Sequence, residues 1–290
     1  MKKILITGVN SYIGTSFKQW VSKFPDLYIV NSISVRDANW KEMSFVGYDV
    51  ILHTAAIVHV KENFTDKYFE VNRDLTVELA KKAKKEGVKQ FIFLSTMGVY
   101  GTETGSITHD TIPVPKTPYA KSKYEAEQLL KRLGNNDFKI AILRPPIVYG
   151  NNSPGNYSRL SNLVLKLPFF PLIENQRSMI YIDNLSEFIR ILINNEIEGL
   201  FFPQNKDYVN TTQLAKLIAK AHQKNLKVTR IFNWIISFGL RKSKTFKKVF
   251  GSFVYDKGMI GSPGTLMLDE SLDYETVLFK DSIIATEIGD

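Results

Sequence analysis

The sequence predicts an α/β fold, in which a doubly wound parallel sheet is followed by a smaller C-terminal region. Short apolar runs alternate with amphipathic segments of helical period, which indicates parallel strands joined by helices. A glycine-bearing turn between Gly8 and Gly14 joins the first apolar run to the first amphipathic segment. The chain has 290 residues, of which 44% are hydrophobic and 23% charged, and this is enough for a substantial core.

The composition excludes several classes of function. The chain has no cysteine, so disulfides, zinc-thiolate sites and thiol catalysis are ruled out, and its four histidines are too scattered for metal-ligand spacing. We therefore expect no metal. No segment reaches the ~18 uninterrupted apolar residues of a membrane span, and the run before Gly8 is too short for a signal peptide. We expect a cytoplasmic protein.

The first strand should run from Lys3 to Thr7, and the helix after the turn should extend to Lys23. Backbone N–H groups and the helix dipole at such a turn form a cradle for a pyrophosphate. Ser11 stands where the pattern Gly-x-x-Gly-x-x-Gly has its middle glycine, and its Cβ limits how closely a phosphate can approach. The candidate cofactor-binding residues of the turn are Gly8, Asn10, Ser11, Tyr12, Ile13 and Gly14.

The second strand is predicted from Tyr28 to Ser34. A NAD-selective site has an acidic residue near the end of this strand, where it binds the ribose. Here the chain continues Ser34-Val35-Arg36-Asp37. Arg36 favours a 2′-phosphate, so NADP(H) is slightly preferred over NAD(H), while Asp37 keeps NAD(H) open.

The third and fourth strands should also end at the ligand edge of the sheet. The third strand is predicted from Asp49 to Thr54, and the small residues Ala55 and Ala56 after it let a cofactor lie over the strand ends. Asn72 precedes a helix that should run through Lys85, and it is a further candidate for cofactor binding. The fourth strand is predicted from Gln90 to Ser95, with Thr96 at its carboxyl end, where open parallel sheets bind ligands.

A tyrosine and a lysine share one face of the next helix. Thr117 provides an N-cap and Pro118 a first-turn proline, so the helix should begin there. Tyr119 and Lys123 lie four residues apart, and a phenol beside a fixed cation is easier to ionise. With Thr96 across the same crevice, the three residues form a proton-transfer constellation.

Five motifs in order resemble the extended short-chain dehydrogenase/reductases of the NAD-dependent epimerase/dehydratase family, which act on nucleotide sugars, and the resemblance runs through the whole chain. The motifs are Thr7-Gly8…Gly14, His53-Thr54-Ala55-Ala56, Leu94-Ser95-Thr96…Val99-Tyr100-Gly101, Tyr119…Lys123 and Leu143-Arg144-Pro145-Pro146-Ile147-Val148-Tyr149-Gly150.

The resemblance implies a Rossmann sheet and a role for each catalytic residue. Tyr119 would be the general acid/base at a sugar hydroxyl or carbonyl, and Thr96 would hydrogen-bond the same sugar oxygen. Lys123 would hold the nicotinamide ribose and lower the pKa of the phenol. Met97, which follows Thr96, is a candidate substrate contact. Relatives commonly form a homodimer through two long helices, including that of Tyr119.

Residues 1–150 are expected to form the dinucleotide-binding domain, to which about 179–203 return, and 151–290 to form mainly a substrate-binding region. We expect a loop over 152–156, a short helix from Leu160 to Lys166, a helix through Asn195, an outer strand from Leu200 to Pro203, and a helix capped by Asn210 or Thr211 that runs to Gln223. By resemblance, Asn156 would contact the sugar diphosphate and Arg177 its phosphates, since a guanidinium bonds phosphate oxygens bidentately.

The net charge of +9 is unevenly distributed. Between Tyr208 and Tyr255 there are ten Lys or Arg and no Asp or Glu. We favour a basic lid that packs the aromatic residues of 232–238 over the nucleotide. The alternative is a segment lying on an anionic membrane surface. No nucleic-acid motif accompanies the charge, and no nucleic-acid partner is expected.

Met97-Gly98 exclude one reaction of the family. Related 4,6-dehydratases have an Asp-Glu pair at these two positions, so dehydration is not expected here. Arg36 favours an NADPH-dependent reductase of a UDP-4-keto-6-deoxy-N-acetylhexosamine. The alternative is an NAD-dependent 4-epimerase of a UDP-hexose or UDP-N-acetylhexosamine. Two further readings are a non-catalytic NADP-binding protein, and a membrane-associated enzyme whose sugar is carried on a lipid diphosphate.

Overall fold

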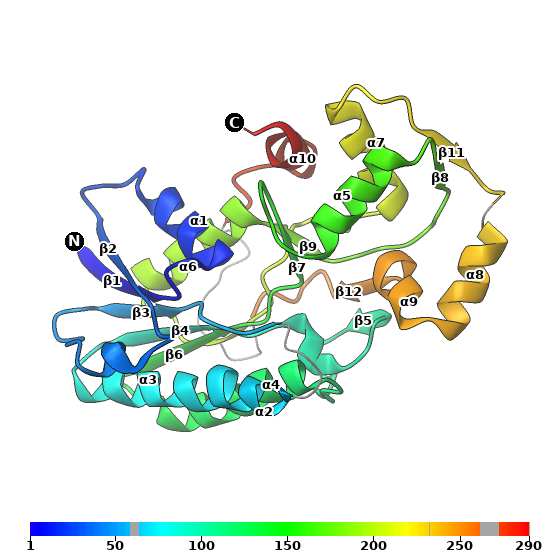
Figure 1. The fold of residues 1–290 in the computed structure, drawn as a ribbon. Helices are drawn as coiled ribbons and strands as arrows, with labels where there is room; N and C mark the ends of the chain where they lie inside the picture. The colour runs from blue at the N-terminus through cyan, green and yellow to red at the C-terminus, as the bar shows by residue number, and fades with distance from the viewer. Residues whose placement is uncertain (59–63, 232, 262–272, 290) are drawn as a thin grey trace.

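A six-stranded parallel sheet forms the centre of the protein. The computed structural model describes residues 1–58, 64–231, 233–261 and 273–289 (Figure 1). The strands lie in the order β10-β6-β4-β3-β1-β2, and every neighbouring pair is parallel. Their bounds are β1 Lys2–Thr7, β2 Tyr28–Ile33, β3 Val50–His53, β4 Gln90–Leu94, β6 Lys139–Leu143 and β10 Gly199–Phe201. The predicted doubly wound α/β fold is confirmed.

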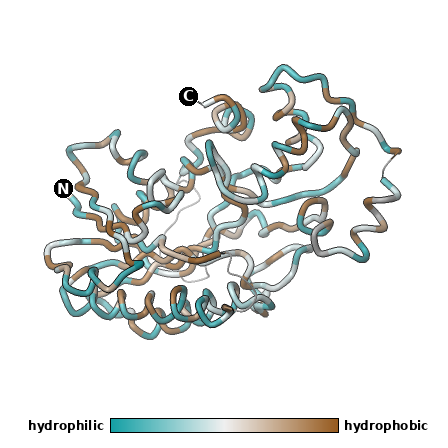
Figure 2. The backbone as a smooth tube through the Cα atoms, viewed as in Figure 1, coloured by the Kyte–Doolittle hydropathy of each residue, from teal (hydrophilic) through white to brown (hydrophobic). Residues whose placement is uncertain are grey.

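Helices cover both faces of this sheet (Figure 1). One face carries α1 (Tyr12–Val21) and α6 (Ile182–Asn194), and the other carries α3 (Leu75–Lys85) and α4 (Pro118–Leu133). A short helix α2 (Asp66–Phe69) and a π-helical turn, η3 (Glu70–Asp74), lead into α3. All residues of β3 and β4 are buried, as expected for parallel strands covered on both sides. In Figure 2 these strands accordingly carry much of the apolar colour.

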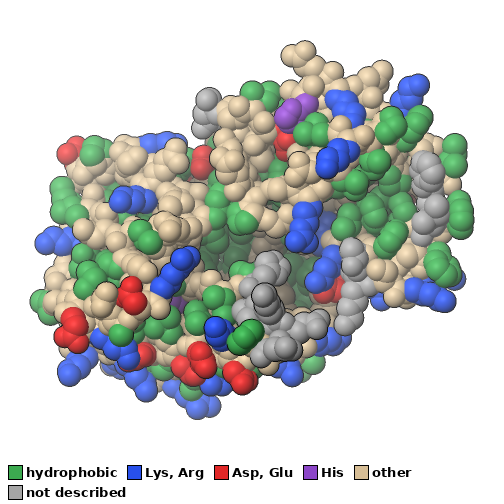
Figure 3. All heavy atoms as spheres, in the orientation of Figure 1, with side chains coloured by type: hydrophobic (Ala, Val, Ile, Leu, Met, Phe, Trp, Pro, Cys, Tyr) green, Lys and Arg blue, Asp and Glu red, His purple; other side chains and the backbone are tan. Residues whose placement is uncertain are grey.

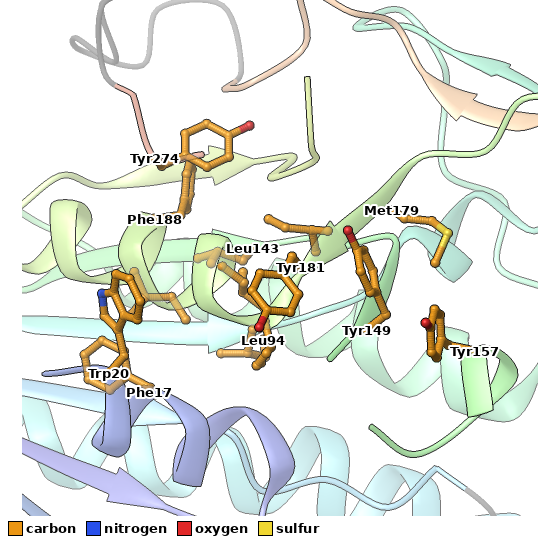
Figure 4. Packing of buried hydrophobic residues seen from close by; sticks show 14 of the residues in the cluster. Phe17, Trp20, Leu94, Leu143, Tyr149, Tyr157, Met179, Tyr181, Phe188 and Tyr274 are labelled. Carbon is orange, nitrogen blue, oxygen red and sulfur yellow. The ribbon is translucent and has the colours of Figure 1, made fainter. Parts of the chain in front are cut away.

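Each face of the sheet has its own apolar core. On one face Phe17 and Trp20 of α1 and Phe188 of α6 pack against sheet residues such as Leu143 (Figure 4). Trp20 also donates its indole N–H to Glu187 at 2.9 Å, which ties α1 to α6. The residues of the other core come from α3, α4 and the opposite sides of the strands, among them Leu79, Leu130, Phe91 and Phe93.

The winding of the chain reverses between β1 and β3, because β1 lies between β2 and β3. Beyond the ends of these strands, the N–H of Gly8 donates to Ile33 and the N–H of Thr54 donates to Thr7. Ligands of open α/β sheets bind at such a switch point, outside the carboxyl ends of the strands.

The C-terminal half is built from short strand pairs and helices. β7 (Ile147–Tyr149) pairs with β9 (Met179–Tyr181), β8 (Phe169–Pro171) with β11 (Lys227–Thr229), and β12 (Phe253–Tyr255) with β5 (Gly105–Ile107). The helices are α5 (Asn156–Lys166), α7 (Thr211–Ala221), α8 (Asn233–Lys242), α9 (Lys244–Phe250) and α10 (Phe279–Ile288). Two 3₁₀ turns, η1 (Ala38–Lys41) and η4 (Met97–Tyr100), follow strands of the main sheet.

The structure corrects several predicted boundaries. Asn156 was expected in a loop but is the first residue of α5, because Gly155 adopts φ +108° and starts the helix earlier. Asn210, rather than Thr211, caps α7, and its side chain accepts the N–H of Gln213. The outer strand β10 begins at Gly199 and pairs with β6. Phe232, the first residue of the expected aromatic lid, lies outside the described residues.

Candidate active site

The turn after β1 depends on its two glycines. Gly8 has φ +104°, and a Cβ there would lie 3.0 Å from the backbone nitrogen of Ala55. A Cβ on Gly14 would come within 2.5 Å of the Ser11 hydroxyl and 2.8 Å of Ile6. Both positions exclude a side chain, so the turn can approach the end of β3 closely.

Ser11 has a structural role inside this turn. Its hydroxyl accepts the N–H of Gly14 at 3.0 Å as the N-cap of α1, and it lies 2.5 Å from the Thr54 hydroxyl. The side chain is thus engaged within the protein. The N–H groups of Tyr12 and Ile13 begin α1 and, as at every helix start, have no partner within the helix. These groups and the helix dipole suit a diphosphate.

Asn72 is fully buried, and its amide is satisfied by the protein. It accepts the N–H of Ile57 at 2.9 Å and donates to the carbonyl of Ile57 at 3.0 Å and to the hydroxyl of Ser122 at 3.2 Å. Asn72 therefore joins Ile57, which follows Ala55 and Ala56, to Ser122 of α4. Ser122 is the residue before Lys123. These bonds give Asn72 a positioning role, and its predicted contact with the cofactor stays a prediction.

Arg36 and Asp37 differ in what occupies their side chains. Asp37 accepts the N–H of Asn39 at 3.1 Å and caps η1. Arg36 is exposed, and within the described ranges no carboxylate pairs with its guanidinium. Of the two residues, Arg36 is the one whose side chain is available to a ligand beyond β2.

Two elements that carry predicted catalytic residues, α4 and η4, pack together, and Lys123 of α4 reaches the carboxyl end of β4. Thr117 caps α4 by accepting the N–H of Ala120 at 3.1 Å, as predicted, and this places Tyr119 in the first turn. The Lys123 ammonium donates to the carbonyl of Leu94, the last residue of β4, at 2.8 Å. α4 also packs against η4, which Thr96 caps by accepting the N–H of Gly98.

The expected acidification of Tyr119 is wrong for this structure. Burial and the neighbouring Tyr68, whose ring lies edge-on 6.3 Å away, raise the pKa of Tyr119 to about 12. Burial also lowers the pKa of Lys123 to about 7, although Glu127 opposes this shift. Because a buried lysine is less fully charged near neutral pH, it gives the phenol less help than a solvated cation.

A buried ionic cluster beneath the site was not predicted. Glu127, one turn after Lys123, is 0% exposed and receives two hydrogen bonds from Arg144, at 2.6 and 3.0 Å. Ser95 donates to the same carboxylate, and Arg144 also donates to the Tyr100 hydroxyl at 3.0 Å. The cluster joins α4, the ends of β4 and β6, and η4. The spacing of Glu127 four residues after Lys123 was the available signal in the sequence.

Met97 and the remaining candidates of the first half lie in different surroundings. Met97 is 6% exposed in η4, and its N–H donates to the carbonyl of Pro145 at 3.0 Å. Asn10 is exposed in the turn. The phenol oxygen of Tyr12 is buried and has no hydrogen-bond partner among the described residues. Gly150 packs against it, since a Cβ there would lie 2.5 Å from this oxygen.

Asn156 and Arg177, far apart in the sequence, line one small pocket of about 30 Å³, together with Lys248 of α9. Arg177 is 8% exposed, and burial lowers its pKa. It donates from Nη1 to the carbonyl of Gly251 at 2.9 Å, whereas its buried Nε has no acceptor. A buried guanidinium with an unused N–H suits an anion. Lys248 was missed because it lies within a longer basic run.

No group of acidic or histidine side chains among the described residues could hold a metal ion.

Comparison with known proteins identifies the family of the chain. Residues 4–201 match the NAD dependent epimerase/dehydratase family. A UDP-glucose 4-epimerase of Vibrio cholerae is 32% identical over 96% of this chain and 90% of that protein. An N-acetyl-alpha-D-glucosaminyl-diphospho-ditrans,octacis-undecaprenol 4-epimerase of Escherichia coli O157:H7 is 25% identical over 77% of this chain and 73% of that protein.

Among solved structures, a UDP-glucuronic acid 4-epimerase from Bacillus cereus in complex with NAD superimposes with a TM-score of 0.72. It is 19% identical and covers 99% of this chain and 96% of its own, so it supports the fold alone. The family match spans both the glycine turn and the Tyr119/Lys123 helix. The chain belongs to the NAD-dependent epimerase/dehydratase family, and it is an NAD(P)-dependent enzyme of the nucleotide-sugar class that its motifs resemble.

Proposed function

We propose that the protein is a 4-epimerase that inverts C4 of a UDP-linked hexose or N-acetylhexosamine with NAD. The single observation that carries this choice is the 32% identity to a UDP-glucose 4-epimerase along 96% of the chain. It reverses the preference for a keto reductase that Arg36 alone suggested. The reaction is redox-neutral, because C4 is first oxidised and then reduced from its other face.

The residues present fit a nicotinamide dinucleotide. The positive φ of Gly8 and the lack of space for a Cβ at Gly14 bring the N-terminus of α1 to the switch point of the sheet, where a diphosphate would accept its N–H groups. Asn72 holds the wall formed by Ala55 and Ala56. When bound, the dinucleotide supplies the acceptor and donor of the hydride.

Tyr119 would carry the proton at the C4 oxygen. It takes the proton of the C4 hydroxyl as that carbon is oxidised, and returns it to the keto oxygen as the carbon is reduced. With its pKa raised to about 12, the phenol keeps its proton near neutral pH and is ready to donate. To act as a base it needs a nearby positive charge, which Lys123 supplies in its protonated form. Thr96 would hydrogen-bond the same oxygen.

The pocket of Arg177 would hold the diphosphate of the substrate. The free Nε–H of Arg177 provides a donor, Lys248 adds a second positive charge, and Asn156 lies at the start of α5 beside them. At about 30 Å³ the pocket has room for little more than one water molecule, so the substrate would have to displace part of α9. Binding there would fix the sugar while its C4 faces Tyr119.

A keto reductase that uses NADPH is a second candidate, and exposed Arg36 is the observation that favours it. A third candidate keeps the epimerase chemistry but takes its sugar on a lipid diphosphate. The name of the Escherichia coli relative, which ends in diphospho-ditrans,octacis-undecaprenol 4-epimerase, supports this form. All three place the same Tyr119 at the sugar C4 oxygen.

Two measurements on the purified protein separate these candidates. The first is the dinucleotide released on denaturation: NAD(H) is expected for the epimerase, whereas protein that comes empty and binds added NADPH supports the reductase. The second is conversion of UDP-glucose or UDP-N-acetylglucosamine to the C4 epimer without net change in NADH absorbance. Failure of both sugars, with dinucleotide bound, would contradict the nucleotide-linked form and leave the lipid-linked sugar or a non-catalytic protein.

A further inference from the structure

Helix α8 turns large apolar side chains toward solvent. Trp234 and Phe238 are four residues apart, so they share one helix face, and their exposed fractions are 72% and 59%. Ile231, just before the helix, is 73% exposed, while Ile236 is buried on the inner side. The lid expected from the sequence would have turned these aromatic residues inward. Single exposed hydrophobic residues are ordinary, but an aromatic pair on one face requires an explanation.

Basic side chains surround this aromatic face. Arg230, Arg241 and Lys242 are exposed, and the Lys242 ammonium lies 5.0 Å from the centre of the Phe238 ring. The chain from 209 to 254 contains ten Lys or Arg and no Asp or Glu. Its formal charge therefore exceeds the net charge of +9 of the whole protein. Among those of these residues whose side chains the structure describes, only Lys248 has a carboxylate partner, Glu103 at 3.6 Å. Most of these charges therefore face solvent unneutralised.

The same surface continues onto the neighbouring strand pair. β11 lies beside β8, and the side chain of Asn233 at the start of α8 donates to the carbonyl of Leu172 after β8. Leu167 and Phe169, at the start of β8, are 37% and 46% exposed. Figure 3 shows hydrophobic and basic side chains together along the edge of the molecule where Figure 1 places α8. We call this surface, formed by Leu167, Phe169, Arg230, Ile231, Trp234, Phe238, Arg241 and Lys242, the α8 face.

We propose that the α8 face docks the protein on an anionic membrane surface, with Trp234 and Phe238 among the lipid headgroups. A helix with aromatic residues on one side and Lys/Arg at its edge binds such an interface by apolar burial together with attraction to anionic lipids. A second copy of the chain fits less well, because an isologous contact would place two strongly basic surfaces against each other.

The α8 face is joined to the proposed diphosphate pocket through one helix pair. α8 packs against α9 at Gly239, where a Cβ would lie 2.3 Å from the Phe246 ring, so the two helices are in direct contact. Lys248 and Val249 of α9 line the pocket with Arg177, which donates to the carbonyl of Gly251 just after α9. Docking would hold this pocket near the bilayer, where a sugar diphosphate carried by a lipid resides. This last step, unlike the docking itself, rests on the proposed function.

Vesicle flotation without any sugar tests the docking separately from catalysis. Vesicles of phosphatidylcholine with about 30% phosphatidylglycerol should carry the protein at low salt, vesicles of phosphatidylcholine alone should carry much less, and salt should release it. Trp234 gives a site-specific signal, because the other two tryptophans, Trp20 and Trp40, are buried. Its emission should shift to the blue on binding.

Two double variants divide the apolar and the charged contributions. Trp234→Ser with Phe238→Ser should abolish flotation, and Arg241→Gln with Lys242→Gln should weaken binding roughly thirtyfold, since each charge near the surface contributes about a factor of five. The matched controls are Val46→Ser, an exposed apolar residue (69%) between η1 and β3, and Lys81→Gln with Lys85→Gln on α3; both variants should float normally.

Circular dichroism and dinucleotide binding show whether each variant is folded. The proposal is overturned if the wild-type protein does not float with anionic vesicles, or if folded Trp234→Ser/Phe238→Ser protein floats as well as the wild type. A Trp234-dependent dimer without vesicle binding would also overturn it, since the face would then be a contact between copies. Docking with turnover confined to soluble UDP-sugars would keep the membrane contact and reject the lipid-linked substrate.

Discussion

The charges of the two halves of the molecule are arranged in opposite ways. Beneath the Tyr119 helix, Glu127 and Arg144 are almost inaccessible and their charged atoms are hydrogen-bonded to each other. Around α8, Arg230, Arg241 and Lys242 are exposed, and Arg177 of the diphosphate pocket is buried with an unused donor. Burying a charge is costly unless it is paired, so the first arrangement serves the fold and the second is suited to anions from outside. The predictions that follow test this contrast.

Tyr119→Phe should have the largest effect. Removing one oxygen from the first turn of α4 leaves the contact with Tyr68 and the helix in place, but takes away the group that moves the proton. We expect kcat to fall by about 10²- to 10⁴-fold with nearly unchanged dinucleotide affinity. Tyr124→Phe on the same helix is the control. Substantial activity of the Tyr119 variant would mean that another residue supplies the base.

Glu127→Gln tests whether the buried cluster serves the fold. The change leaves Arg144 charged and buried without its counter-ion, which costs about 3–5 kcal/mol of the free energy of unfolding. For a chain of this length Tm should fall by roughly 5–8 °C. The control is Glu125→Gln two residues earlier, whose carboxylate pairs with Arg73 at the surface, at 2.7 Å. That loss should be at most about 1 kcal/mol. Equal losses for the two variants would contradict the distinction between the halves.

Lys123→Met should raise the stability of the protein near pH 6 while it removes activity. The reason is that the Lys123 ammonium is buried and donates to a neutral carbonyl, that of Leu94. The pKa of Lys123 in the folded protein is about 7, below its ordinary value of 10.5. Between these values the unfolded chain holds more protons, so the free energy of unfolding of the wild type should rise with pH. Near pH 6, where the charge must be buried, the variant should be more stable by roughly 2 kcal/mol.

Urea unfolding at several pH values measures this difference. The advantage of Lys123→Met should shrink as the pH rises from 7 towards 10, while turnover is lost throughout. Lys121→Gln is the control, because Lys121 is exposed on the same helix, and it should leave the pH dependence of the stability unchanged. A variant that is less stable than the wild type at pH 6 would show that the Leu94 hydrogen bond outweighs the cost of burial.

The sequence predicted the sheet well because parallel strands leave a strong local pattern. The four strands through β4 were placed to within one residue, since buried apolar runs end at turn signals such as Gly8 and Gly87. The cap of α4 at Thr117 was also correct. The family's motifs group Tyr119, Lys123 and Thr96 from the sequence alone, and their joint role stays a prediction.

What the sequence could not give depends on contacts between distant segments. The pairing of Glu127 with Arg144, the engagement of Asn72 by Ile57 and the raised pKa of Tyr119 all follow from burial, which no local pattern specifies. Asn156 of α5 and Lys248 of α9 are 92 positions apart in the sequence but line the same pocket. The outward direction of Trp234 likewise depends on which side of α8 meets α9.

Replacing Arg36 should have the smallest effect. Arg36 lies in the first half of the molecule, yet it is an exposed cation without a carboxylate partner among the described residues. It therefore tests the contrast between paired and unpaired charges within that half. If it serves a 2′-phosphate, Arg36→Ala should weaken NADPH binding roughly fivefold and leave NADH nearly unchanged. Lys41→Ala in the same loop is the control, because Lys41 already pairs with Glu78 at 2.6 Å and should affect neither dinucleotide. Titration calorimetry with both dinucleotides measures the ratio. Equal losses would remove the argument for NADP(H) and leave NAD, as the epimerase requires.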